Sequence, residues 1–458
     1  MRGYADNSRS NLSARLGRTI FGGTLIIVAL TAIPYGTVDP WWESVFEAAV
    51  FAIVILCLIE AAIIRSTPLE QWRLLYPLFA IAGLAVVQSI TWGHRAGGAA
   101  MEGTLLGRAL SADPFETCRF AFKLLATTLC FAILLRHTSN PVRFRLLVFM
   151  IVSVALASAL FGLARTVLTH PVFSRLNPDR SFGQFENRNH FALLMEIGIG
   201  VILGLGLSQR HRRLRLVACV LAGLVLWTAL LLTHSRGAVV SLMVEIPFFF
   251  LLYSIYRAAS GDKGRVISSR SFSPLKKIGL AGLLLATVAA SVVLIGGDQT
   301  IDHLRETPDE FAQSIDGTPK VARPEIWQAT LKLIRHNPVM GVGFAAYPMA
   351  ISKYLESSPG KFNPLQAHND YLEVLASGGI VAGSLFAWFL IGCVRQIRAR
   401  LQSRDPNLAV RCGACAGLFA IGVHSLFDFG LHITVNALAC MALIIVAVKS
   451  VAEKPVSI

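Results

Sequence analysis

The sequence has 458 residues, of which 54% are hydrophobic and 15% are charged, and its mean hydropathy is +0.60. This composition is too apolar for a water-soluble protein, and the length allows about a dozen membrane spans of roughly 20 residues each. The net charge of +15 does not indicate a nucleic-acid partner, because most of the 42 basic residues stand in short loops beside apolar runs. Basic residues in such loops are a signal of membrane topology.

Apolar runs suited to membrane helices recur along the chain. We place them at residues 19–35, 44–64, 74–92, 117–135, 146–167, 190–207, 216–233, 237–256, 278–296, 370–394, 409–426 and 432–448. They predict an all-α polytopic integral membrane protein with about twelve transmembrane helices. An even number of spans puts both termini on one side, and the basic residues of alternate loops make that side the cytoplasm.

One long segment interrupts this series of spans on the external side. We expect cytoplasmic tails at 1–18 and 450–458, nine helices within 19–297, an external loop or lid with short helices at 298–367, and three helices within 368–449. The basic residues outside the cytoplasmic loops cluster beside polar motifs. They suggest an anionic ligand on the outer face, although solvated loop charges account for some of them.

The fourth predicted span carries charge into the membrane. Glu116, Arg119 and Lys123 recur at helical spacing and share one face, which reaches about 10 Å inward at 1.5 Å per residue. Two interpretations stay open at this point. The three residues form either an internal ion pair that holds the bundle or a basic wall of an external cavity, with Lys123 as a substrate contact.

Polar residues gather before the sixth span, where the sequence reads Asn187-Arg188-Asn189-His190. Amide, guanidinium and imidazole groups together suit the binding of sugar hydroxyls and phosphate. A helix cap alone would explain Asn189 but not the other three residues. We therefore expect this group to bind substrate.

The hairpin between the seventh and eighth spans contains only residues 233–237. It is too short to form a surface of its own, so it must place Arg236 at the rim of the bundle. We favour anion binding for Arg236, and a tight turn accounts for Gly237.

Within the external segment, residues 323–335 predict a short amphipathic helix. Trp327, Leu331 and Ile334 form an apolar stripe that can lie on the bundle as a lid. Arg323 then stands at the helix N-terminus, where free amide groups and the helix dipole add to its charge in binding a phosphate.

The chain returns to the membrane through a turn and a polar motif. Gly341 and Gly343 predict the turn, and His368, Asn369 and Asp370 stand at the outer mouth of the tenth span. An imidazole is costly to strand in lipid and useful in a water-filled cavity, so we interpret His368 as functional. A capping or interfacial histidine is the alternative.

Two patterns could suggest a metal site. Cys412 and Cys415 have no second pair and no nearby histidine. His424, Asp428 and His432 are spaced four residues apart, but a predicted turn interrupts any shared helical face. We expect no metal ion, and we expect Asp428 to contact the acceptor or to line a polar interior.

Taken in order, these motifs resemble those of the O-antigen ligase and polymerase family. The resemblance covers roughly residues 180–450 and rests on Asn-Arg-Asn-His before one span, Ser-Arg-Gly between two spans, Arg-x-x-x-Trp and His-Asn-Pro-Val-Met-Gly-Val-Gly in the long loop, and Ala-His-Asn-Asp-Tyr-Leu before Gly378-Gly379. It implies a fold like that of the C-type membrane glycosyltransferases, with no cofactor. By motif, the long-loop arginine corresponds to Arg323, the histidine to His368 and the hairpin arginine to Arg236.

The resemblance also implies a reaction. A glycan carried on undecaprenyl diphosphate would be transferred to an acceptor hydroxyl at the periplasmic face of the bacterial inner membrane. With a neutral His368 imidazole as the base for that hydroxyl, we expect inversion at the anomeric carbon. Such a reaction needs cations for the leaving diphosphate and a base for the acceptor proton. We expect catalytic roles for His368, Arg323 and Arg236, and substrate-binding roles for Arg188, Asn187, Asn189, His190, Lys123, Asn369, Asp370 and Asp428.

The acceptor and the class of function leave alternatives. We favour a polymerase, whose acceptor is another lipid-linked repeat, over a ligase, whose acceptor is lipid A-core. A small-solute or inorganic-carbon transporter is a second alternative, although its broken helices and polar residues would lie near the midplane. The expected partners are the lipid-linked donor, either acceptor, membrane lipids and other polysaccharide-assembly proteins, but no nucleic acid.

Overall fold

The computed structural model describes residues 2–64, 73–92, 108–167, 182–208, 213–259, 282, 323–355, 364–403 and 405–451. The predicted span at 278–296 lies outside these residues, apart from residue 282. Residues 298–322 and 356–363 of the predicted external segment also lie outside them.

The described helices match the remaining predicted spans in chain order. They are α1 (Arg2–Leu30), α2 (Pro40–Ile64), α3 (Tyr76–Ser89), α4 (Pro114–His137), α5 (Pro141–Val167), α7 (Arg188–Ser208), α8 (Arg213–Leu232), α9 (Arg236–Ala259), α13 (Asp370–Gln402), α14 (Leu408–His424) and α15 (Thr434–Val448). Eight of them are long and apolar enough to cross a membrane, and α3, α14 and α15 are shorter apolar helices. The prediction of an all-α polytopic membrane protein is therefore confirmed.

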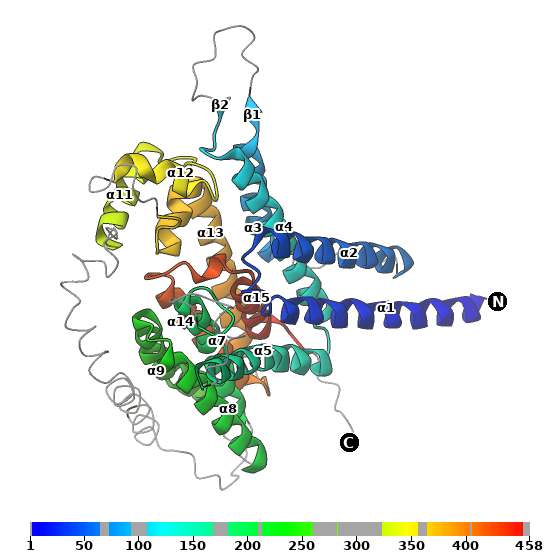
Figure 1. Cartoon of the computed structure of the whole chain (residues 1–458). Coiled ribbons are helices and arrows are strands. Elements are labelled where there is room, and N and C mark those ends of the chain that lie inside the picture. The colour runs from blue at the N-terminus through cyan, green and yellow to red at the C-terminus, as the bar shows by residue number, and fades with distance from the viewer. Residues whose placement is uncertain are drawn as a thin grey trace.

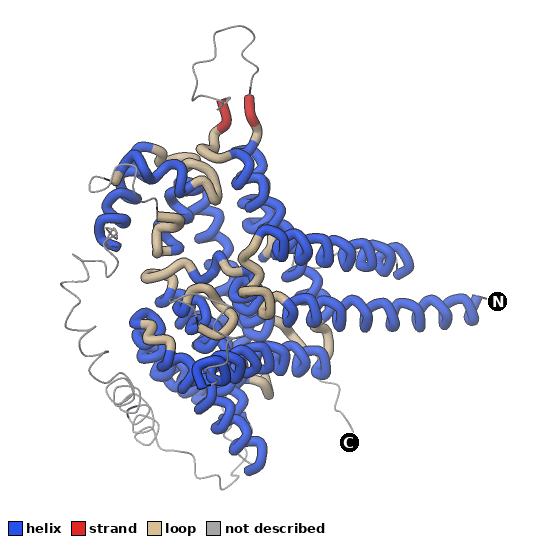
Figure 2. Tube along the Cα trace, viewed as in Figure 1, coloured by secondary structure: helices blue, strands red, loops and turns tan. Residues whose placement is uncertain are grey.

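The bundle is built around α14, which packs against α7, α9 and α15. Helices α5 and α8 also pack against α7, and α3 packs against α4 and α13 (Figure 1). The paired helices α1 and α2 extend away from this body (Figure 1). Strands β1 (Thr91–Trp92) and β2 (Arg108–Ala109) pair antiparallel and form a narrow arm beyond α3 and α4 (Figure 2).

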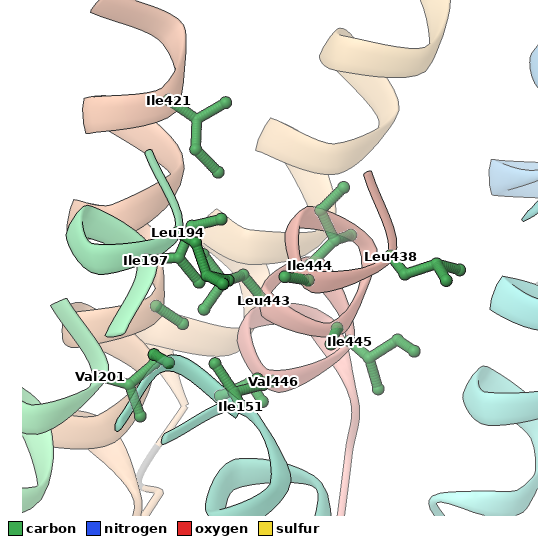
Figure 3. Close-up of a cluster of buried hydrophobic side chains, with 14 of the residues drawn as sticks. Ile151, Leu194, Ile197, Val201, Ile421, Leu438, Leu443, Ile444, Ile445 and Val446 are labelled. Carbon is green, nitrogen blue, oxygen red and sulfur yellow. The ribbon is translucent and has the colours of Figure 1, made fainter. Parts of the chain in front are cut away.

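The apolar core lies where α5, α7, α14 and α15 meet. Figure 3 shows Ile151, Leu194, Ile197, Ile421 and Leu443 among its side chains, and all of them are buried. Lipid tails are as apolar as these residues, so the association of membrane helices depends on close packing. Glycines on the facing surfaces of α7 and α14 allow that approach.

The described part of the predicted external segment, residues 323–355 and 364–367, contains three short elements, α11 (Arg323–His336), α12 (Tyr347–Ile351) and the 3₁₀ helix η2 (Ser352–Tyr354). They lie at the end of the bundle where α13 begins (Figure 1), which the charge pattern predicts to be the outer end. A second 3₁₀ helix, η3 (Gly430–His432), lies between α14 and α15. The predicted amphipathic helix at 323–335 is thus confirmed.

Helix α13 is broken in its third turn. Gly379 has φ 60° and ψ −159°, a combination that is essentially restricted to glycine. The chain after α11 fills the break with its own backbone, since Ile380 N–H donates to Pro338 O and Val342 N–H to Ala376 O, both at 2.9 Å. These bonds satisfy backbone groups that the interrupted helix leaves open.

The predicted turn at Gly341 and Gly343 belongs to the part of the chain that fills the break in α13. Both residues have positive φ, 65° and 101°. The side-chain amide of Gln88, on α3, donates to Met340 O at 2.6 Å and to Ser377 O at 3.0 Å. The turn, the break in α13 and α3 therefore form one hydrogen-bonded unit.

The break in α13 bears on the alternative that the protein is a transporter, because a transporter would have broken helices near the midplane of the membrane. The broken helix is present in α13, which is interrupted nine residues after Asp370, roughly 14 Å from the helix start at 1.5 Å per residue, or about half of a hydrocarbon core of about 30 Å. Protein backbone occupies the break. The break therefore serves to seat the external segment on the bundle.

We expect Gly379→Ala to lower the stability of the folded protein by about 1–3 kcal/mol or more, because alanine is strained at this φ and ψ. Its Cβ would also overlap the carbonyl group of Val339. The measurement is the thermal unfolding midpoint in detergent. Gly83→Ala on α3 is the matched control, since its Cβ would meet no atom within 4 Å, and equal midpoints for the two variants would contradict the proposed strain.

Candidate active site

His368 and Asp428 form a pair at the end of the bundle where α13 begins. The Nδ1 atom of His368 lies 3.3 Å from Oδ1 of Asp428, and the side chains are 30% and 2% exposed. An ionised carboxylate only accepts hydrogen bonds, so the pairing places the proton of a neutral imidazole on Nδ1. The lone pair on Nε2 of His368 is then available for a substrate proton.

The environment of Asp428 keeps its carboxyl group ionised. Burial opposes the charged form, but the hydrogen bond from His368 and the charges of His190 and His424 outweigh it. Together they hold the pKa of Asp428 well below its usual range. A negative charge is therefore present beside His368 throughout the physiological pH range.

The backbone before α13 sets the position of His368. Asn369 caps the helix, since its side-chain oxygen accepts from Tyr371 N–H at 3.0 Å, and its amide donates to Leu426 O at 3.0 Å. The N–H of Asp370 donates to Ser425 O at 2.9 Å. The capping role thus belongs to Asn369, while His368 has φ 50°, an uncommon value for a residue other than glycine.

Helix α11 reaches the residue directly before His368. The indole N–H of Trp327 donates to Ala367 O at 3.1 Å, and Ala367 N–H donates to a carboxylate oxygen of Glu373 at 2.9 Å. Arg323, an exposed residue, begins the same helix one turn earlier. The external segment is therefore bonded to the segment that carries His368.

The predicted apolar stripe of α11 is wrong at Leu331, which is 44% exposed. The buried residues are Ile326, Ala329, Thr330 and Leu333. Two of these side chains explain why α11 buries this face and not the predicted one. Alanine allows a close approach, and the Thr330 hydroxyl satisfies its hydrogen-bonding needs inside the interface, through the backbone oxygen of Ile326 and the hydroxyl of Tyr347 on α12.

Of the predicted group at the start of α7, His190 reaches the pair. Its Nε2 atom lies 4.0 Å from Oδ1 of Asp428 and 3.5 Å from the side-chain nitrogen of Asn187. Asn187 also accepts from Asn189 N–H at 2.9 Å, which shapes the turn into the helix. Arg188 is exposed as the first residue of α7.

Phe429 lies at the centre of the site, although no sequence motif indicated a role for it. Its ring centroid is 4.6 Å from that of His190, 4.9 Å from His368 and 6.1 Å from His432. The Nε2 atom of His432 is 3.6 Å from Oδ1 of Asp370. The position next to Asp428 was the only sequence signal for this aromatic residue.

Arg236 is exposed as the first residue of α9. The connection from α8 is residues 233–235, and the left-handed residue in it is His234, with φ 51°. The expectation that a tight turn requires Gly237 is therefore wrong, because α9 has already begun there. Ser235 starts that helix by accepting from Ala238 N–H at 3.4 Å.

Lys123 lies at the edge of the site in a charged cluster. Its ammonium group is 2.5 Å from a carboxylate oxygen of Glu43 and 2.9 Å from His432 O. Arg119 bridges Glu43 and Glu116, at 3.4 and 2.9 Å. These are the contacts of the internal ion-pair interpretation, and they join α2 and α4 to η3.

The family model for O-antigen ligase matches residues 221–387. The matched residues run from α8 into α13 and include Arg236, Arg323 and His368. Arg188 and Asp428 lie outside the match. Over these residues the chain is similar to the O-antigen ligase family, and the resemblance to the O-antigen ligase and polymerase family is confirmed there. No curated protein matches the chain.

We expect Asp428→Asn to lower the unfolding temperature at neutral pH, and the difference from the wild type to narrow as the solution is acidified. The folded pKa of Asp428 is depressed, so its ionisation stabilises the protein above the unfolded pKa of about 4 and loses this effect as the pH falls towards the folded pKa. Unfolding midpoints between about pH 7 and pH 3 would measure this. A pH-independent difference would contradict it, and Glu186→Gln, at an exposed position, is the control.

Proposed function

We propose that this multi-pass membrane protein transfers a glycan from an undecaprenyl-diphosphate carrier to an acceptor hydroxyl at the periplasmic face of the inner membrane. The observation that carries the proposal is the His368–Asp428 pair. The match of residues 221–387 to the O-antigen ligase family model supports the same class of reaction. Both termini are then cytoplasmic, as the basic loops predict.

In the proposed reaction His368 is the general base. Nε2 takes the proton of the acceptor hydroxyl as the hydroxyl oxygen attacks the anomeric carbon of the donor glycan. The bond between that carbon and the diphosphate oxygen breaks, and its electron pair leaves with undecaprenyl diphosphate. Attack opposite the leaving group inverts the configuration. Asp428 stabilises the imidazolium that forms, through the bond at Nδ1.

Three arginines are proposed to bind the diphosphate, namely Arg188, Arg236 and Arg323. Each is exposed and each is the first residue of a helix, α7, α9 and α11 respectively. A helix N-terminus offers unpaired N–H groups and the positive end of the dipole. Guanidinium groups add bidentate hydrogen bonds to phosphate oxygens. This combination suits a leaving group whose negative charge grows during the reaction.

The remaining predicted residues are proposed to orient the substrates. Asn187, Asn189, His190 and Asp370 lie at the starts of α7 and α13, and Asn369 caps α13. Lys123 is proposed as an outer contact for the donor in addition to its ion pair. The acceptor is either a lipid-linked repeat or lipid A-core, since the base and the cations serve both equally. We favour the lipid-linked repeat.

We expect His368→Ala and Arg323→Ala to lower transfer of glycan from a lipid-linked donor by at least about 100-fold in a purified assay, because one removes the base and the other a cation at the leaving group. Both proteins should insert normally, since both side chains are partly or fully exposed. Arg335→Ala, an exposed arginine at the other end of α11, is the matched control. Full activity in either site variant would remove its proposed role.

A strain that lacks the protein distinguishes the two acceptors. If the protein is a polymerase, lipopolysaccharide gels should show core capped with a single repeat, because ligation continues without chain extension. If the protein is a ligase, they should show bare core with accumulated lipid-linked polymer. The second profile would contradict the acceptor that we favour, and an unchanged profile would contradict both.

A further inference from the structure

His424 and Glu196 form a hydrogen-bonded pair inside the bundle, below the His368–Asp428 pair. The Nδ1 atom of His424 lies 2.8 Å from Oε1 of Glu196, and the side chains are 1% and 0% exposed. Glu196 lies on α7, eight residues after Arg188, or about 12 Å along the helix. His424 is the last residue of α14. The bond therefore joins two helices at a level just beneath the proposed active site.

The same imidazole lies close to the start of α9. A Cβ atom on Gly237 would lie 3.8 Å from Nε2 of His424 and 3.7 Å from Phe427. Gly237 directly follows Arg236 in the chain. His424 thus lies among the helices whose outer ends carry Arg188 and Arg236.

The residues after His424 carry the site. The carbonyl oxygen of His424 accepts from Phe427 N–H at 2.8 Å and from Asp428 N–H at 3.1 Å. The carbonyl groups of Ser425 and Leu426 hold Asp370 and Asn369, the two residues after His368. The turn at 424–428 therefore sets the positions of both Asp428 and the segment that presents His368.

The stability of the bundle alone does not account for this pair. A buried imidazole and carboxylate lose hydration, and well-packed apolar residues of similar size often stabilise a protein as well or better. The adjacent apolar cluster, with Leu194, Ile197 and Ile421, already packs α7 against α14 (Figure 3). A hydrogen bond adds a defined direction, which apolar packing does not, and so fixes the rotation of the end of α14.

We propose that Glu196 and His424 are positioning residues for the transfer reaction. Their hydrogen bond fixes the turn at 424–428 so that Asp428 meets Nδ1 of His368. This inference rests on the proposed function, because its consequence is a change in the rate of transfer. Loss of the bond shifts the turn while the arginines stay on their own helices, so the rate of the chemical step falls more than donor binding does.

The test compares purified Glu196→Ala, Glu196→Gln and Glu245→Ala with the wild type, using a lipid-linked donor. We expect Glu196→Ala to lower kcat at least about 10-fold with the donor KM changed less than about twofold. Glu196→Gln should stay within about threefold of the wild type, because its amide oxygen accepts the same bond. Glu245 is the matched control, since it is a fully buried carboxylate on α9 whose oxygens have no hydrogen-bond partner among the described residues; its alanine variant should keep the wild-type kcat.

A double-variant comparison separates positioning from general damage. In an Asp428→Asn background, Glu196→Ala should have less than about a threefold further effect on kcat, because the residue that it positions is already disabled. Independent, multiplying effects would overturn the proposal, as would a wild-type kcat in Glu196→Ala. If Glu196→Ala does not insert, His424→Gln and His424→Leu give the same comparison from the other side of the bond. We expect His424→Gln to keep kcat within about threefold of the wild type and His424→Leu to lower it at least about 10-fold. Equal kcat values for these two variants would overturn the proposal.

The wild-type protein in the same assay distinguishes this inference from the proposed function. A wild type that forms no product with any lipid-linked donor and acceptor tested would overturn both. An active wild type with an equally active Glu196→Ala variant would overturn the positioning role alone.

Discussion

Every backbone N–H and C=O group at membrane depth must find a partner within the protein, because lipid supplies none. Helix α13 breaks at Gly379, and the chain around Pro338 and Val342 satisfies the groups that this break leaves open. The external segment is consequently fixed to the bundle at one end of α11. From there α11 extends to the bond between Trp327 and Ala367, directly before His368. The site depends on this connection, since it holds an external helix against the mouth of the bundle.

The end of the bundle where α13 begins, which the basic loops predict to be the outer end, concentrates charges that a membrane would otherwise exclude. Helices α7, α9 and α11 each begin with an exposed arginine, and α13 begins at a buried aspartate, Asp370. Asp428 is buried but has an imidazole partner, and Lys123 has a carboxylate and a carbonyl partner. Asp428 and Lys123 are thus paired where water is scarce, and the three arginines are exposed, which agrees with the proposed site for an anionic lipid-linked substrate.

Much of the fold and part of the site were predictable from the sequence. Spans follow from runs of apolar residues, and α11 follows from the apolar period after Arg323. The prediction that His368 and its neighbours belong to the site follows from polar groups at the head of an apolar helix. The buried face of α11 was not predictable, because Thr330 meets a hydroxyl partner on α12 that its own helix does not reveal. The turn between α8 and α9 was also assigned to the wrong residue, since the sequence pointed to Gly237 and the residue with positive φ is His234.

The sequence by itself determined the order of the described apolar helices, the charge pattern that predicts their orientation, and the set of polar residues at one end of them, because these depend on residues close together in the chain. Only the tertiary structure decided which of those residues meet. Asp428 and His368 are 60 positions apart, and His424 and Glu196 are 228 apart. Such contacts depend on how helices rotate and pack against each other, which is set by close packing and buried hydrogen bonds across the whole bundle and leaves no local pattern in the sequence.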